Sequence, residues 1–285
     1  MAQRPESAAP AYAGRRPFYL MLVLCLVLLV LRAADLALFT DPVTGFVRDD
    51  WFALRLLLPL LAALAGYLLS RRLAQRPAAL LGRCPLLGNS LLAVGVALLA
   101  AGLIYGLELL LPGYGSTVLL PLRLACSLLS AAWFLWFGVR AFSPLGDPAA
   151  RLPGSLNILG GAAFFFCVLL LRFTLEAASV QRLGCTLRVL SAATAMLFLI
   201  SLFRVFLTPG LPVGRSLFSA GFNIFLFGSC QELPQTLFEW AAGTAALSDV
   251  AVGLAMGLLG LAGLACAWYA CSEDAALPRP EKAEA

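Results

Sequence analysis

The chain of 285 residues is 61% hydrophobic and 12% charged, and its mean hydropathy is +0.92. Soluble domains average roughly 45–50% apolar and about 25% charged residues, so this composition excludes a soluble globular protein and predicts a polytopic membrane protein. The net charge of +5 is small and spread along the chain, which argues against nucleic acid as a partner.

The chain contains no histidine, and this absence excludes several chemistries. HExxH zinc sites, Ser-His-Asp triads and Cys-His pairs all need an imidazole. The sequence also lacks a GxxxxGK[ST] phosphate loop, and its eight cysteines form no CxxC pair. We therefore expect a protein that is not an enzyme and that uses no metal or other cofactor.

Apolar runs separated by Pro- and Gly-containing connections predict the helices in chain order. A transmembrane helix needs around 20 residues to cross a ~30 Å hydrocarbon core. The first run could be a signal peptide, but its roughly 23 residues exceed the about 7–15 residues of such an apolar region. We expect spans over residues 17–39, 51–70, 88–111, 117–142, 156–178, 184–208, 214–233 and 248–270.

These runs predict an all-α integral membrane protein with about eight transmembrane helices. Residues 17–271 would form a single eight-helix domain, between polar and disordered tails at 1–16 and 272–285. Basic residues are enriched in cytoplasmic segments of membrane proteins, which allows the orientation to be predicted. With both termini in the cytoplasm, the outer loops hold Arg48 and Arg182, and the inner segments hold Arg4, Arg15, Arg16, Arg71, Arg72, Arg76, Arg83, Arg140, Arg151, Arg204, Arg215, Arg279 and Lys282.

The connection after the first span, TDPVTGFVRDDW at 40–51, is the most motif-like stretch. Residues 41–45 predict a tight turn, because Asp, Pro and Gly each favour turn conformations. Phe46 and Trp51 would anchor this loop at the outer interface, where aromatic side chains are enriched. The alternative is a lid over the polar residues of the outer half.

The segment DPVTGF at 41–46, placed after a first span, resembles a loop found in uncharacterised multi-spanning membrane proteins of clostridial bacteria. The similarity is firm over about a dozen residues and loose over the helical layout. It implies a multi-pass protein of the bacterial plasma membrane and does not indicate any biochemical activity.

A helical hairpin of about 65 residues recurs along the chain. The second, fourth and sixth spans open with Leu-Arg at Arg55, Arg123 and Arg188, and each preceding span carries an acid near its outer end. The last hairpin departs from this pattern, because Asp249 stands where the arginine would be. Four repeated hairpins are one interpretation; chance similarity of Leu/Ala-rich sequence is the other.

The recurring charges are predicted to form a layer in the outer half of the bundle. An acid near a helix C-terminus and an arginine near an N-terminus are each unfavourable for the helix dipole, so each needs a partner. The simplest partners lie across each hairpin, at matching depth. This predicts the pairs Asp35–Arg55, Glu108–Arg123 and Glu176–Arg188, with Arg32 and Arg172 on the same helix faces as Asp35 and Glu176.

Two interpretations of this layer are open. Structural ion pairs could fix the helices against one another, or a cavity with surplus arginine could bind an anionic or zwitterionic solute. The seventh span is the most polar, and Pro234 follows it; an interrupted span is a usual place for a transporter site. The candidate residues are Arg32, Asp35, Arg55, Glu108, Arg123, Arg172, Glu176, Arg188, Gln231 and Glu232.

These features favour a protein that binds or transports a small solute. A non-catalytic accessory, sensor or scaffold protein with structural ion pairs is the alternative. GxxxG patterns at Gly102/Gly106 and Gly253/Gly257 predict close packing within the bundle, with a homodimer or a membrane-protein partner on the Gly-rich eighth span as the second possibility.

Overall fold

The computed structural model describes residues 15–41, 44–47, 52–71, 73, 80, 84–111, 119–142, 157–175, 183–208 and 213–271. Within these ranges the regular elements are helices, and a single isolated bridge joins Thr40 to Val47. The elements are α1 (Arg16–Phe39), α2 (Phe52–Ser70), α3 (Pro85–Leu110), α4 (Leu119–Arg140), α5 (Asn157–Leu175), α6 (Leu183–Leu207), α7 (Gly214–Ile224), the π-helical segment η3 (Phe225–Glu232), α8 (Leu233–Ala241) and α9 (Leu247–Ala270).

This architecture confirms the prediction of an all-α membrane protein. Six of the described helices are long and apolar enough to cross a membrane. The shorter apolar helix α5 and the continuous helix formed by α7, η3 and α8 complete eight helical segments. The tails predicted at 1–16 and 272–285 lie outside the described residues, apart from Arg15 and Arg16.

The seventh segment differs from its prediction. It does not end near residue 233 but continues to Ala241, and Pro234 does not interrupt it. The amide of Leu233 donates to the carbonyl of Gly228, five residues earlier, in the wide π turn just before the proline. Pro234 then occupies the first turn of α8. A wider turn relieves the clash between a proline ring and the preceding turn, which would otherwise break the helix.

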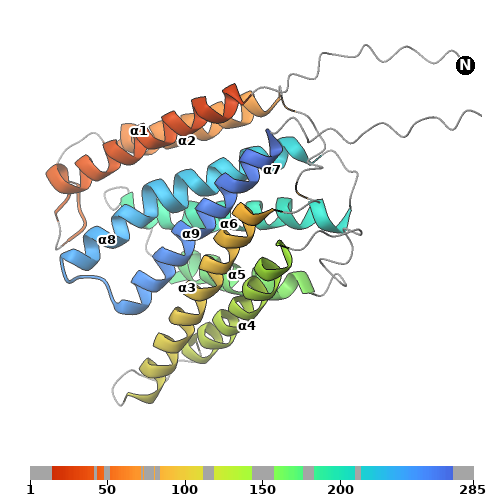
Figure 1. Ribbon diagram of the computed structural model, residues 1–285. Helices are drawn as coiled ribbons and strands as arrows, with labels where there is room; N and C mark the ends of the chain where they lie inside the picture. Colours follow the sequence, from red (N-terminus) through yellow and green to blue (C-terminus); the bar gives the residue numbers. More distant parts are fainter. Residues whose placement is uncertain are drawn as a thin grey trace, which may run out of the picture.

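The beginning of α1 and the end of α9 lie side by side, as an even number of crossings between them requires. α1 begins and α9 ends at the same end of the bundle (Figure 1). The Arg15 guanidinium lies 4.5 Å from the centre of the Trp268 ring, and the Phe18 ring lies 5.1 Å from the same residue. The predicted eight crossings are consistent with this contact.

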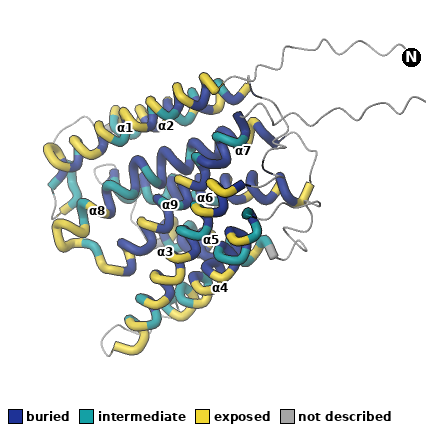
Figure 2. The backbone as a smooth tube through the Cα atoms, viewed as in Figure 1, coloured by how far each residue is buried: buried dark blue, intermediate teal, exposed yellow. Residues whose placement is uncertain are grey.

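Helix α9 is the most buried long helix and packs against α3, α7 and η3 (Figure 2). Its glycines face the α7–η3–α8 helix, where backbones meet directly. A Cβ atom on Gly263 would lie 2.6 Å from the carbonyl oxygen of Gly221, and one on Gly228 would lie 2.7 Å from the carbonyl oxygen of Met256. The small-residue stripe is therefore used inside the bundle, which leaves no free glycine face on α9 for a homodimer.

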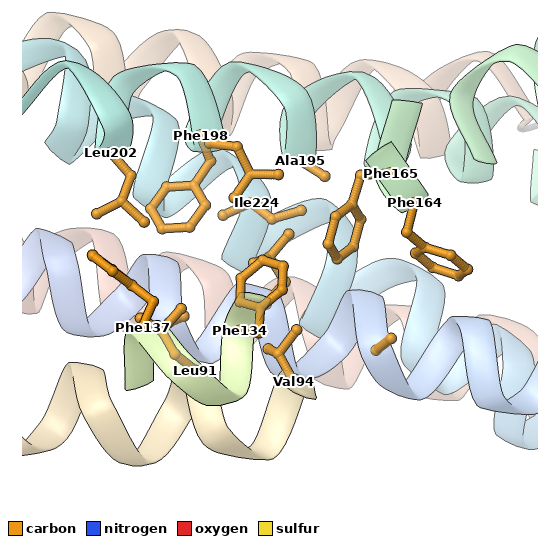
Figure 3. Packing of buried hydrophobic residues seen from close by; sticks show 14 of the residues in the cluster. Leu91, Val94, Phe134, Phe137, Phe164, Phe165, Ala195, Phe198, Leu202 and Ile224 are labelled. Carbon is orange, nitrogen blue, oxygen red and sulfur yellow. The ribbon is translucent and has the colours of Figure 1, made fainter. Parts of the chain in front are cut away.

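Aromatic rings fill the space between α4, α5 and α6. Figure 3 shows Phe134, Phe165 and Phe198 gathered around Ile224 of α7. The rings of Phe134 and Phe165 meet edge to face, with centroids 5.8 Å apart, a favourable aromatic geometry. In contrast, the outward faces of α1 and α2 are apolar and exposed, as lipid-facing surfaces are (Figure 2).

The loop between α1 and α2 forms the predicted tight turn. The amide of Gly45 donates to the carbonyl of Asp41 at 2.9 Å, and the Thr44 hydroxyl donates to the Asp41 carboxylate at 2.6 Å. Gly45 has φ of 68°, a left-handed conformation that suits glycine. Phe46 is half-buried, and the predicted anchor Trp51 lies outside the described residues.

We predict that Gly263→Ala lowers the stability of the bundle. The new methyl group would press on the Gly221 carbonyl, and overpacking of this kind costs about 1–3 kcal/mol of unfolding free energy. The matched control is Gly106→Ala, whose nearest neighbour is the Leu124 Cδ1 atom at 4.0 Å. Denaturant unfolding in detergent micelles should separate the two variants, and equal stability would contradict the packing described.

Candidate functional site

The ion pairs of the described residues lie at the end of the bundle opposite the beginning of α1 and the end of α9. The first cluster joins α1 to α2. The Nε atom of Arg55 lies 2.8 Å from Oδ1 of Asp35, and Nη1 of Arg32 lies 2.7 Å from Oδ2 of the same carboxylate. The predicted pair across the first hairpin and the predicted pair within α1 are both confirmed. One carboxylate thus neutralises part of the charge of two arginines.

This cluster continues into α8 through amide and carboxylate groups. The second guanidinium nitrogen of Arg32 donates to the Gln235 side-chain oxygen, and the Gln235 amide donates to Glu239 at 2.6 Å. Glu239 forms an ion pair with Arg188 of α6. A continuous series of polar contacts therefore connects α2, α1, α8 and α6.

The most buried ion pair joins α5 to the end of η3. Both guanidinium nitrogens of Arg172 bind the Glu232 carboxylate, and the side chain of Glu232 has no exposed surface. Nη1 of Arg172 also donates to the carbonyl of Arg188 at 2.8 Å. The Thr236 hydroxyl donates to the carbonyl of Glu232 one turn earlier, at 3.0 Å. This bidentate geometry offsets part of the desolvation of both charges.

One of the predicted hairpin pairs is not formed, and another falls on a residue outside the described ranges. Glu108 and Arg123 are both described and half-buried, yet they form no ion pair, so that prediction is wrong. Half-buried side chains near helix ends can be solvated by water or headgroups without a protein partner. Glu176 lies outside the described residues, so the pair Glu176–Arg188 stays a prediction; Arg188 forms an ion pair with Glu239.

Six helices enclose a pocket of about 90 Å³ beside the Arg172–Glu232 pair, which we call the arginine pocket. This volume accommodates several water molecules or a small solute. The wall combines charged, hydroxyl and apolar groups. It is formed by Tyr105, Arg123, Val168, Leu171, Arg172, Arg188, Glu232, Thr236, Asp249 and Val252.

Three polar groups of this wall have no partner among the described residues. Arg123 and Asp249 take part in none of the ion pairs, and Tyr105 makes no side-chain hydrogen bond. The Tyr105 residue is only 2% exposed, whereas Arg123 is half-buried and Asp249 is exposed. All three side chains border the pocket.

A second, smaller pocket of about 60 Å³ lies between α1, α2 and η3. Arg32, Asp35, Arg55 and the predicted candidate Gln231 contribute to its wall. Gln231 is buried there and takes no part in the arginine pocket. In the described part of the chain, no group of three or more Cys, Asp or Glu residues is arranged to hold a metal ion.

Sequence reasoning missed Tyr105, Gln235, Glu239 and Asp249. Gln235 and Glu239 lie beyond residue 233, the expected end of the seventh span. Asp249 was visible as the departure from the arginine pattern in the last hairpin. Tyr105 belongs to no pattern in the sequence.

No protein-family model, curated protein or solved structure matches the chain.

We predict that Arg172→Met destabilises the protein by about 3–5 kcal/mol, because it leaves the Glu232 carboxylate buried without a counter-ion. Adding Glu232→Leu to the same chain should restore most of the loss, since an apolar pair of similar volume is tolerated in place of a buried ion pair. Unfolding in detergent micelles provides the measurement.

Arg123→Met is the matched control, because Arg123 has no ion-pair partner within the described ranges. Its unfolding free energy should stay close to that of the parent protein. Equal decreases in unfolding free energy for Arg172→Met and Arg123→Met would show that the buried Arg172–Glu232 pair does not contribute specially to stability.

Proposed function

We propose that the protein binds a small anionic or zwitterionic solute in the arginine pocket and carries it across the membrane. The observation that supports this most is Arg123, a cation on the pocket wall without a protein partner among the described residues. A charged side chain within a membrane span is costly unless something neutralises it. A solute carboxylate or phosphate would do so.

The surrounding charges support the same proposal. Arg172 and Arg188 are held by Glu232 and Glu239, so their positions are fixed before any ligand arrives. Fixed charges reduce the ordering cost of binding. The pocket wall is formed by residues from α3, α4, α5, α6, the η3–α8 junction and α9, so movement of any one helix would change its shape. Such a site between helices is typical of transporters.

The proposed orientation places both termini in the cytoplasm of a bacterium and the arginine pocket at the outer face. The asymmetry of basic residues supports it, because connections near the termini-bearing end carry most of the arginines. The adjacency of Arg15 and Trp268 is consistent with both ends on one side.

A scaffold or sensor function is the second candidate, and a specific observation favours it. The contacts from Arg55 through Asp35, Arg32, Gln235 and Glu239 to Arg188 join four helices without needing a ligand. If the arginine pocket only holds water, these contacts would serve the stability of the bundle alone. Binding experiments separate the two candidates.

We predict that Arg123→Gln abolishes most solute uptake while protein abundance and thermal stability stay normal. Proteoliposomes would be tested with labelled inorganic phosphate, succinate and L-alanine. Loss of one charge-assisted contact should weaken binding by about 10- to 100-fold. Arg204→Gln, an exposed arginine on α6 at the other end of the bundle, is the control and should transport normally. Uptake of none of the three solutes would favour the scaffold function.

We predict that a cysteine at residue 244 reacts with a membrane-impermeant maleimide added to intact cells, whereas one at residue 71 reacts only after permeabilisation. Both positions are exposed and lie at opposite ends of the bundle. The background should carry Cys126→Ser and Cys185→Ser, because the other six cysteines are buried. The reverse labelling pattern would overturn the orientation.

A further inference from the structure

We infer that the arginine pocket recognises a zwitterion, a small neutral α-amino acid, with Arg123 binding its carboxylate and Asp249 binding its ammonium group. This inference rests on the proposed function and narrows its class of solute. It depends on Asp249, which sequence analysis did not include in the site.

The charges on the pocket wall leave one cation and one anion available. Three arginines and two acids line the pocket. Arg172 is neutralised by Glu232, and Arg188 is neutralised by Glu239, which lies outside the wall. The remaining two, Arg123 and Asp249, take part in no ion pair among the described residues. A ligand that carries both signs of charge matches this pair.

Arg123 and Asp249 face one pocket but do not close on each other. Their charged atoms are separated by more than the 4.0 Å that defines an ion pair. A purely anionic ligand would neutralise Arg123, but its negative charge would lie near the Asp249 carboxylate. The repulsion between the two negative charges would weaken binding. A purely cationic ligand would meet the opposite problem at Arg123. A ligand with both groups satisfies each residue at once.

The two residues lie near the beginnings of two different helices, α4 and α9. Asp249 lies in the first turn of α9, where the helix dipole favours a carboxylate, and its amide is bound by the carbonyl of Ala246. Arg123 lies near the beginning of α4, where the dipole disfavours a cation. The ligand carboxylate would relieve that unfavourable placement.

The remaining wall fits the uncharged part of such a ligand. Val168, Leu171 and Val252 present apolar surface, and Tyr105 adds a hydroxyl group that makes no hydrogen bond within the described part of the chain. A pocket of about 90 Å³ limits the ligand to the smallest amino acids. The expected ligands are therefore glycine and alanine.

The test compares three charge forms of the same ligand on the full-length protein in nanodiscs. Glycine and L-alanine are each offered as the free amino acid, as the anionic N-acetyl derivative and as the cationic methyl ester, and binding is measured by calorimetry. The free amino acid should bind at least about tenfold more tightly than either derivative, since each derivative loses one charge-assisted contact.

Two variants assign the groups. Asp249→Asn should weaken binding of the free amino acid by about 10- to 100-fold and leave binding of the N-acetyl form unchanged or tighter. Arg123→Gln should weaken binding of both forms. Arg204→Gln should change neither. If the N-acetyl forms bind as well as the amino acids and Asp249→Asn has no effect, the zwitterion inference fails and the proposed anion transport stands. If no form of any ligand binds, the inference is overturned, and uptake of phosphate or succinate then decides the proposed function separately.

Discussion

The buried ion pair between Arg172 and Glu232 is the interaction on which the charged end of the bundle depends. An ionised carboxylate with no exposed surface is stable only if it is paired and fully hydrogen-bonded. The bidentate contact meets this requirement and joins α5 to the end of η3. The additional bond from Arg172 to the Arg188 carbonyl brings in α6. The fifth, sixth and seventh helical segments are thereby held at one depth, and the arginine pocket lies beside them.

The position of Glu232 depends in turn on how α7, η3 and α8 pack against α9. Glycines on both helices allow their backbones to meet, and Ser229 of η3 donates to the carbonyl of Gly257 at 2.6 Å. The π segment extends from Phe225 to Glu232, so the pocket residue Glu232 is its last member. Segments of this kind change the direction in which later side chains point, and they occur often at functional sites. Gln235 and Glu239 follow one and two turns later, facing α1 and α6.

Much of the fold could be predicted from the sequence, because hydrophobic length and Pro/Gly punctuation are local properties. The eight segments, the turn at Asp41–Gly45 and the pair Asp35–Arg55 all follow from neighbours in the chain. The partners of Arg172 and Arg188 could not be predicted, because they lie on helices that are distant in sequence. The end predicted for the seventh helix near Pro234 was wrong, because no sequence pattern indicates the π segment that accommodates this proline. Glu108 shows that a recurring charge placement does not ensure a recurring contact.

The continuous helix from Gly214 to Ala241 is longer than a bilayer requires. At about 1.5 Å per residue it extends about 40 Å, against a hydrocarbon core of ~30 Å. Excess length is accommodated by tilting or by projecting into the headgroup region. Its last turn carries Glu239 and the largely exposed Trp240, a residue type that prefers the interfacial zone. A change in membrane thickness would then change the depth of this helix. Because Glu239 forms an ion pair with Arg188, the same change would shift Arg188 in the pocket wall, and the shape of the pocket would depend on lipid chain length.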